Sequence, residues 1–416
     1  MLVAYFMKSF NCLAQKQMKR IFLVMNILLV NDQYFLANNG MTISARRFAQ
    51  VLRSHGNDVR IVSTGREGDS PYLMKKRHVP FFDWLITSQG MAFAITDKKV
   101  YKEALEWADV VHFLSPFSLT HNGIKMAREM GIPYTAAFHV QPENITSSIH
   151  LSKFEGINNF IYRWFKSYIY KYCTHIHCPS NFIANELRKH NYYGQFHVIS
   201  NGIDPDFKYR KIAKTSEFEG KFLILTIGRL SIEKRQDVLI DAIKKSKYSD
   251  KIQLVIAGQG PRKEQLLKHA QGLINPIIIN FYTHQELLNV IAMSDLYVHP
   301  AQAEIEAMSC MEAFAGGLVP IIANSKKSAT PQFALDERSL FETGNSDDLV
   351  QKIDYWIEHE EERKHMEHEY SKSAQKYNLE ECVCEAEKMF AMAIESANRA
   401  KEEGRYASSR TKNPKK

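Results

Sequence analysis

Short runs of apolar residues alternate with amphipathic helical patterns along most of this chain. The first such unit is the apolar run Ile27–Val30, followed by a helical pattern over Ser44–Ser54 that Gly56 ends. Buried strands that alternate with helices predict parallel sheets with crossover helices. The further strands predicted in the first half are Val59–Val62, Val110–Phe113, Tyr134–Ala137, Ile176–Cys178 and Val198–Ile199. The helices predicted between them are Lys99–Trp107, Ile124–Met130, Phe154–Tyr172 and Phe182–Lys189.

The second half repeats this alternation, so the sequence predicts an α/β protein of two doubly wound, Rossmann-like domains facing a cleft. The polar stretch between Ile203 and Glu219 is the expected boundary. We therefore divide the chain into an N-terminal domain over 25–205, a second domain over 206–378, and a terminal helix over 379–404 that packs back on the first domain. The strands predicted in the second domain are Phe222–Ile227, Leu254–Ala257, Ile277–Phe281, Leu296–Val298 and Val319–Ala323.

Length and charge narrow the classes of partner. The chain has 416 residues, too many for one ordinary core, and a net charge of +8 with a pI near 8.9. This charge favours anionic partners such as nucleotides, phosphates or membrane surfaces. Part of it is local, because the tail over 405–416 carries five basic residues and no acid, and we expect this tail to be disordered. The six cysteines fit no zinc-site spacing and are interpreted as free thiols of a reducing compartment.

The sequence offers no membrane-spanning helix, because no window holds about 18 uninterrupted apolar residues. Residues 1–24 form an extension without the apolar core and small-residue cleavage site of a signal peptide. This extension is either an amphipathic anchor or the product of a mis-assigned start, and we favour Met25 as the start over Met1. The expected location is the cytoplasm.

Candidate binding residues follow the predicted strands, because ligands of doubly wound sheets bind beyond the carboxyl ends of the strands. Gly228 allows a turn after Phe222–Ile227, and Arg229 and Lys234 then lie near the start of a helix. A helix N-terminus with two added cations suits a pyrophosphate. A solvated helix start explains the same residues about as well.

Glutamates follow the predicted strand Leu296–Val298. Glu304 falls in a loop and Glu312 in the second turn of the next helix, so both carboxylates can point into one cleft. Favourable interaction with the helix dipole would explain Glu304 and Glu306, but not Glu312, whose neighbours in the sequence are apolar. Buried carboxylates need partners, so we expect the pair to face polar groups of a ligand.

Several segments together resemble one family of enzymes. The stretch "HPAQAEIEAMSCMEAFAGGLVPIIA" is similar to the signature of retaining nucleotide-sugar glycosyltransferases of family four, which have the GT-B fold. The segments "TIGRLSIEKRQDVLIDAI", "VISNGIDPDFKY", "YTAAFHVQPENI" and "NNGMTISARRFAQVLRSHGNDVRIVST" match further motifs of that family in the same order. The resemblance covers roughly residues 25–400 and is specific for fold and reaction class.

The resemblance implies roles for residues of the second domain, which becomes the donor domain. Arg229 and Lys234, after Gly228, would hold the donor diphosphate. Glu312 would accept hydrogen bonds from the ribose hydroxyls, and Glu304 would bond a hydroxyl of the donor sugar. The backbone near Tyr282 would bracket the base.

In the first domain, which becomes the acceptor domain, the resemblance implies two further site residues. Gly40 would let the first loop approach the diphosphate, and His139 would lie by the sugar and the reaction centre. His112 is a second histidine at the end of a predicted strand, and both could instead be hydrogen-bonded core residues. The sequence departs from the family at Ile305 and Glu306, where Gly and an aromatic residue are common, so Glu306 is expected to bring an extra acid near the anionic donor.

The function that follows is transfer of a hexose, from UDP-glucose or UDP-galactose, with retention of configuration as the resemblance implies. No spacing of acidic residues suggests a metal, so the transfer is expected to need neither metal nor cofactor, and no nucleic acid is expected as a partner. The alternatives are saccharide assembly for capsule or lipopolysaccharide, a non-enzymatic nucleotide-binding module, and a sugar-nucleotide epimerase.

The acceptor is predicted from residues 152–175, in which eight aromatic residues alternate with basic ones. A helix of this composition suits an anionic membrane interface, although a helix that packs its apolar face on the first sheet is an even competitor. We therefore expect a membrane lipid or lipid-linked acceptor, reached by peripheral binding to the inner face of the cell membrane.

Overall fold

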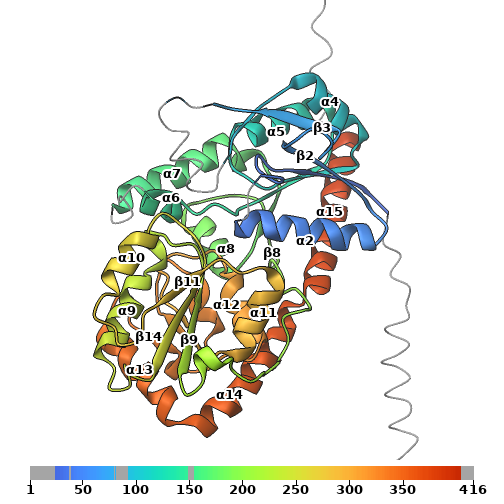
Figure 1. Ribbon diagram of the computed structural model, residues 1–416. Coiled ribbons are helices and arrows are strands. Elements are labelled where there is room, and N and C mark those ends of the chain that lie inside the picture. Colours follow the sequence, from blue (N-terminus) through green and yellow to red (C-terminus); the bar gives the residue numbers. More distant parts are fainter. Residues whose placement is uncertain (1–23, 37–38, 79, 81–91, 149–153, 404–416) are drawn as a thin grey trace, which may run out of the picture.

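The computed structural model describes residues 24–36, 39–78, 80, 92–148 and 154–403. The extension over 1–23, the tail over 404–416 and part of the aromatic segment, residues 152–153, therefore lie outside the described residues. Two α/β lobes are joined by connecting segments of the chain and by the long C-terminal helix (Figure 1). Among the described helices, none has both the length and the apolar composition that crossing a membrane would require.

The first domain is built on an eight-stranded sheet in the order β4-β3-β2-β1-β5-β6-β7-β8, parallel except where β3 meets β4. Its strands are β1 (Asn26–Val30), β2 (Asp58–Thr64), β3 (Tyr72–Lys76), β4 (Ala94–Ile95), β5 (Val110–Phe113), β6 (Tyr134–Ala137), β7 (His175–Cys178) and β8 (Gln195–Val198). Its helices are α2 (Gly40–Ser54), α4 (Lys98–Trp107), α5 (Ser118–Met130), α6 (Pro142–Ser148), α7 (Glu155–Tyr168) and α8 (Asn181–Lys189).

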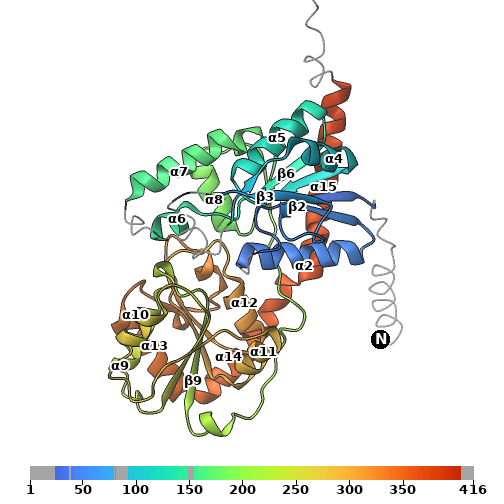
Figure 2. The ribbon, with the colours of Figure 1, turned by 45° about the horizontal axis from the view of Figure 1, so that its top comes forward.

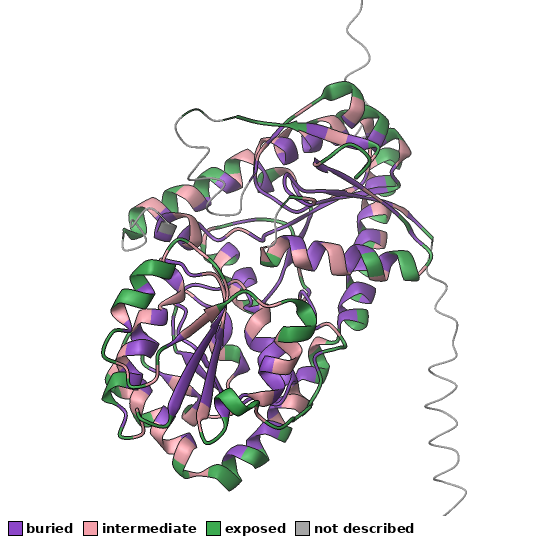
Figure 3. Cartoon of the chain, viewed as in Figure 1, coloured by how far each residue is buried: buried purple, intermediate pink, exposed green. Residues whose placement is uncertain are grey.

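The second domain is built on a parallel six-stranded sheet in the order β11-β10-β9-β12-β13-β14. Its strands are β9 (Phe222–Ile227), β10 (Ile252–Ala257), β11 (Ile278–Asn280), β12 (Leu296–His299), β13 (Pro320–Ala323) and β14 (Leu340–Phe341). Its helices are α9 (Gln236–Lys245), α10 (Lys263–His269), α11 (His284–Met293), α12 (Met308–Ala315), α13 (Ser346–Glu358) and α14 (Glu360–Ser373). The strands β9, β10, β12 and β13 are mostly buried, and the helices turn their exposed sides outward (Figure 3).

The last helix, α15 (Leu379–Glu402), leaves the second domain and lies on the first (Figures 1 and 2). Its apolar residues Val383, Met389 and Phe390 join one core cluster with strand residues Ile27 and Leu29. With α2 it therefore covers one face of the eight-stranded sheet. The chain passes between the domains at two adjacent places, because the Ile203 backbone N–H donates to the Tyr377 carbonyl at 2.8 Å.

Some elements differ from the sequence expectation. β3, β4, β14 and α6 were not predicted, because two of these strands have only two residues and β3 ends in two exposed lysines that break its apolar pattern. The helix predicted over Phe154–Tyr172 begins at Glu155 and ends at Tyr168. It is followed by the 3₁₀ turn Tyr170–Tyr172, because Ile169 leaves the helical conformation.

Candidate functional site

In each sheet the strand order reverses beside the first strand of the domain. In the second domain β9 lies between β10 and β12, and the helices that follow β9 and β12 leave toward different sides. Such a switch point opens a crevice at the carboxyl ends of the two strands. The loop Gly228–Arg235 follows β9 and the loop Pro300–Ala307 follows β12, so the two segments singled out from the sequence are brought side by side.

The loop after β9 is shaped by glycine and by a left-handed turn. Gly228 has φ +156°, and Arg235 has φ +50° directly before α9 begins. A Cβ atom on Gly258, in the loop after β10, would lie 1.9 Å from the Gly228 carbonyl oxygen. The close approach of these two backbones is therefore possible only with glycine at 258.

Glu304 lies in the loop after β12, as predicted, and its carboxylate is paired inside the protein. Its Oε1 oxygen accepts a short hydrogen bond from Lys234 Nζ and lies 3.1 Å from His299 Nε2. Burial opposes the charged form, but Lys234 and His299 outweigh it and lower the pKa of Glu304 to about 2. Glu304 is therefore a carboxylate at neutral pH, held at the switch point by a cation.

Arg229 lies in the same loop but has a different partner. Its guanidinium donates to Glu233 Oε1 at 3.0 Å, and the Ser231 hydroxyl donates to the same oxygen at 2.5 Å. Glu233 is buried, so it fixes Arg229 close to the first turn that leads into α9. The structure thus places two cations, Arg229 and Lys234, in one loop at the carboxyl end of β9.

Glu312 lies on α12 and connects the two domains. Its Oε1 accepts a hydrogen bond of 2.7 Å from Arg47 Nη1 on α2, and Arg47 also lies 3.5 Å from Asp204. Burial raises the pKa of Glu312, and the Arg47 charge offsets part of that rise. Sequence reasoning missed Arg47, although it lies in the segment "SARRFAQ" of a motif that it quoted. No periodicity distinguishes this arginine from its neighbour Arg46.

Glu306, which was expected to bring an extra acid near the donor, has hydrogen-bond partners within the protein. Its Oε2 accepts hydrogen bonds from the backbone N–H and side-chain amide of Asn201, at 2.9 and 2.6 Å. Ser44 on α2 donates in turn to Asn201 Oδ1 at 2.7 Å. Glu306 is buried and belongs to the junction between the domains, because its loop turns toward the segment that joins them.

The predicted residues of the first domain lie along α2 and β6. Gly40 begins α2, and a Cβ atom there would lie 3.8 Å from Met308 Cε, at the start of α12. His139 follows β6 and is 8% exposed. Its ring lies 5.1 Å from that of His177, and His112 lies 5.7 Å from His177.

The three histidines line a small cavity of about 20 Å³ whose other lining residues are mostly apolar. Burial, and then the neighbouring His177, lowers the pKa of His139, so its imidazole is neutral at pH 7. Tyr282, near which the backbone is predicted to bracket the base, is half-buried in the loop between β11 and α11.

Two groups among the described residues offer metal-ligand atoms within 4.8 Å of one another. One consists of Asp204, Asp206 and His284, of which the last two are exposed. Neither group could be found from sequence spacing, because each joins residues of distant segments. The other group consists of His55, Cys384 and Glu387, at the far end of α2.

The fold is that of a two-domain α/β protein in which cations and carboxylates gather at the switch point of the second sheet. The family model described as "Glycosyltransferase Family 4" matches residues 38–207, and "Glycosyl transferases group 1" matches residues 208–374. The protein is a glycosyltransferase, and the chain belongs to the family-four glycosyltransferases of GT-B fold.

Named relatives agree with this assignment. The chain is 26% identical over 321 residues to alpha-monoglucosyldiacylglycerol synthase from Streptococcus pneumoniae, which covers 72% of this chain and 71% of the relative. It is 27% identical over 313 residues to a GDP-mannose-dependent alpha-mannosyltransferase from Corynebacterium glutamicum, with 72% of each chain covered. The mannosyltransferase name and the two family models describe transferases, which favours transfer over the epimerase and the non-enzymatic alternatives.

Solved structures show the same fold. The crystal structure of WaaG, a glycosyltransferase involved in lipopolysaccharide biosynthesis, superposes with a TM-score of 0.63 at 18% identity, covering 88% of this chain and 99% of that one. A catalytic domain of cholesterol-alpha-glucosyltransferase from Helicobacter pylori is 48% identical but covers 38% of this chain and 99% of that chain. Its TM-score of 0.37 is too low to support an argument about fold or function.

The site geometry predicts that Glu312→Ala and Lys234→Ala each lower turnover at least about tenfold. Each change removes a charged hydrogen-bonding group, and about 1.4 kcal/mol of lost transition-state stabilisation corresponds to a factor of ten. Steady-state transfer assays measure the loss, and circular dichroism shows whether the variants are folded. Glu361→Gln and Lys372→Ala on α14 are matched controls, since both side chains are more than two-thirds exposed. Transfer by both site variants at the rate of these controls would contradict the assignment.

The junction residue Glu306 gives a prediction about pH. Burial raises the pKa of Glu306 from the usual 4.5 to about 7, although Ser200 and Asn201 donate hydrogen bonds that favour its carboxylate. Because the pKa of Glu306 is raised in the folded state, its contribution to the free energy of unfolding is complete below pH 4.5. This contribution is lost as the pH rises through 7. At roughly 1.4 kcal/mol per unit of pKa shift, the free energy of unfolding falls by about 3 kcal/mol across this range.

We therefore expect the free energy of unfolding of the wild type to fall relative to that of Glu306→Gln as the pH rises from 4.5 to 7. Urea denaturation at several pH values measures the difference, and Glu361→Gln controls for the loss of an exposed carboxylate. Parallel pH profiles for the wild type and Glu306→Gln would show that Glu306 titrates as it does in the unfolded chain.

Proposed function

We propose that this glycosyltransferase transfers a hexose from a nucleotide-sugar, UDP-glucose or UDP-galactose, to a membrane lipid or lipid-linked acceptor with retention of configuration. The observation that carries the donor half of this proposal is the contact between Lys234 and Glu304 at the carboxyl ends of β9 and β12. It joins a group that binds phosphate to one that binds hydroxyls, as a nucleotide-sugar requires.

The chemistry needs charge stabilisation at two places. Breaking a sugar–phosphate bond builds positive charge on the ring and negative charge on the departing diphosphate. Arg229, Lys234 and the chain entering α9 would stabilise the diphosphate. When the diphosphate binds, Lys234 gains a second anionic partner, and Glu304 can then accept a hydrogen bond from a sugar hydroxyl.

The transfer proposed here uses no metal ion. Lys234 and Arg229 supply the positive charge that a divalent cation supplies to a diphosphate in other enzymes. Glu312 would then bind the ribose in place of Arg47, whose guanidinium keeps Asp204 as a neighbour.

The lipid acceptor is supported by the exposed surface of α7. Phe160 and Trp164, one turn apart, are 61% and 44% exposed, and Phe154 just before the helix is 58% exposed. Tyr162 and Phe165 of the same helix are buried in the core of the first domain. The helix therefore has a core side and, in addition, an aromatic side that the fold does not cover.

Arg163 shares the exposed side of α7 with Phe160 and Trp164, and Lys166 lies on the flank of the helix. Arg163 is exposed, and Lys166 Nζ lies 4.7 Å from the ring centre of Tyr193, which is 72% exposed. Aromatic rings between cations suit the interface of a membrane with anionic lipid. The Streptococcus pneumoniae relative is named for a glucosylated diacylglycerol, and this name supports an acceptor of this kind.

A donor and acceptor panel tests the function. UDP-glucose, UDP-galactose and GDP-mannose are each offered with vesicles that contain diacylglycerol, ceramide, a sterol or a lipid-linked saccharide, with EDTA present and absent. We expect a labelled hexose in the lipid fraction from a UDP-sugar, at a rate that EDTA leaves largely unchanged. Transfer from GDP-mannose alone would contradict the donor. Full activity on a soluble saccharide would support saccharide assembly, and a loss in EDTA that Mg²⁺ or Mn²⁺ restores would contradict metal independence.

The α7 surface predicts membrane binding that depends on lipid charge. We expect the protein to sediment with anionic vesicles, to stay in solution with neutral ones, and to bind less as salt rises, because exposed charges are screened over about 8 Å at physiological ionic strength. Phe160→Ser with Trp164→Ser should weaken sedimentation, whereas Ile274→Ser, which removes a 64% exposed residue of the second domain, should not. If the α7 variant bound anionic vesicles as well as Ile274→Ser does, the α7 surface would not be the membrane-binding surface.

A further inference from the structure

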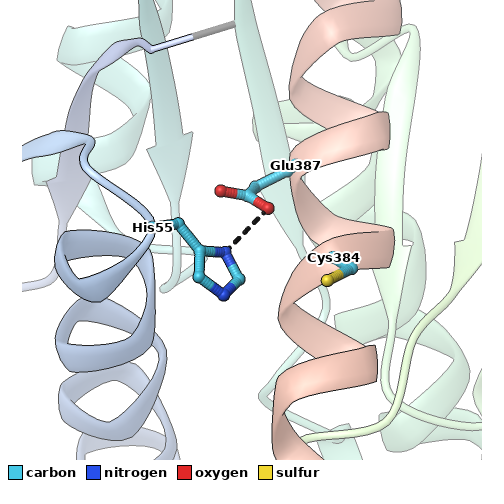
Figure 4. A group of neighbouring side chains, drawn as sticks. All are labelled: His55, Cys384 and Glu387. Carbon is cyan, nitrogen blue, oxygen red and sulfur yellow. Dashed lines mark hydrogen bonds and ion pairs between the residues drawn. The ribbon is translucent and has the colours of Figure 1, made fainter. Parts of the chain in front are cut away.

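A second cluster of reactive side chains lies at the end of α2 opposite to the donor site. His55 follows α2, whereas Cys384 and Glu387 lie one turn apart on α15, on the side that faces α2 (Figure 4). The ligand atoms of these three residues lie within 4.8 Å of one another. The Cys384 and Glu387 side chains are buried, and His55 is half-buried.

The groups around the cluster fix the direction of two of these ligand atoms. Glu380 Oε1 lies 2.5 Å from His55 Nε2, which leaves Nδ1 as the ring nitrogen that faces Glu387. Asn57 donates to Glu387 Oε1 at 2.7 Å, and Asn57 is itself held by bonds to Leu52 and Met25. The other carboxylate oxygen, Oε2, lies 3.0 Å from His55 Nδ1 (Figure 4). A carboxylate on the outer ring nitrogen is the usual support of a metal-binding histidine.

A simpler account treats the cluster as an ion pair. His55 lies between two carboxylates, and their hydrogen bonds outweigh burial and raise its pKa, so a protonated imidazole would satisfy both glutamates. That account explains His55, Glu380 and Glu387. It gives no function to the Cys384 thiol, which is the third ligand atom of the cluster.

We propose that His55 Nδ1, Cys384 Sγ and Glu387 Oε2 bind a zinc ion, with a water molecule as the fourth ligand. A set of nitrogen, thiolate and carboxylate ligands suits Zn²⁺ and does not suit Mg²⁺ or Ca²⁺, which take oxygen ligands. Binding displaces the proton shared by His55 and Glu387 and the proton of the Cys384 thiol, so it is linked to proton release.

The distances are compatible with this site. Ligand atoms about 2.0 to 2.3 Å from a tetrahedral zinc ion lie roughly 3.3 to 3.8 Å from one another. The cluster, with its ligand atoms within 4.8 Å, needs a contraction of about 1 Å at most, which a side-chain rotation supplies. The backbone of α2 and α15 can stay in place.

A metal here would hold the last helix on the first domain and would take no part in the reaction. α2 has 15 residues, so at 1.5 Å per residue about 22 Å separates His55 from Gly40, where the helix meets the donor domain. The proposal is therefore independent of the metal-free transfer proposed above, and each can fail without the other.

Zinc titration of the full chain tests the site. Metal-free protein, prepared by dialysis against a chelator, competes with a chromophoric chelator for Zn²⁺, and Co²⁺ replaces Zn²⁺ in a second titration. We expect each chain to bind one equivalent of Zn²⁺ tightly and the Co²⁺ form to show a thiolate charge-transfer band. The melting temperature should rise with Zn²⁺ but not with Mg²⁺. Zinc at 100 times its dissociation constant should lower the unfolding equilibrium constant about 100-fold.

Variants assign the ligands. Cys384→Ser and His55→Gln should each lose the tight equivalent, and Cys384→Ser should lose the charge-transfer band. Cys382→Ser is the matched control, since Cys382 is a buried cysteine on the same helix and is not part of the cluster. Asp206→Asn controls for the exposed cluster near Glu312. If Cys384→Ser does not fold, His55→Gln decides. Wild-type protein without a tight equivalent, or variants that bind zinc as the wild type does, would overturn the proposal.

Discussion

The contact between Lys234 and Glu304 depends on the geometry of a parallel sheet. The two residues are 70 positions apart in the chain, but β9 and β12 are neighbours, and all loops from their carboxyl ends emerge at one edge. At the point where the strand order reverses, the following helices separate and leave space above the strands. A buried carboxylate is stable there only because a cation reaches it, and the pair remains available for a ligand that carries both phosphates and hydroxyls.

The segment over 304–312 has three acids with three different kinds of partner. Glu304 is paired within its own domain, Glu306 with the linker residue Asn201, and Glu312 with Arg47 of the other domain. One short stretch therefore contributes to the donor site, to the junction and to the contact between domains. On the proposed function, a ribose and Arg47 compete for the same carboxylate, so donor binding and the relation of the two domains are coupled energetically.

Much of this organisation could be predicted from sequence, and the rest could not for physical reasons. Apolar runs marked most central strands, because buried parallel strands are apolar on both faces. They did not mark β4 and β14, which have two residues each, or β3, which ends in two exposed lysines. Position after a strand located Lys234, Glu304 and Glu312, since the fold brings such positions together.

The partners of these residues could not be predicted from the sequence. Which cation meets Glu312 depends on how two domains dock, and no local pattern separates Arg47 from Arg46. The partner of Glu306 could not be predicted for the same reason, because Asn201 belongs to a linker whose path is set by the whole fold. The zinc cluster joins residues more than 320 positions apart, so spacing rules for metal sites do not apply to it.

The position of α15 has a consequence for how the chain folds as it is synthesised. The face of the first sheet that Val383, Met389 and Phe390 cover is made of strands near the beginning of the chain. Until α15 has left the ribosome, α2 covers that apolar face only in part, although the whole second domain has already been made. Domains usually fold in the order of synthesis, N-terminal first. Here the first domain to emerge is the last to be completed, and its exposed sheet is the species that chaperones would meet.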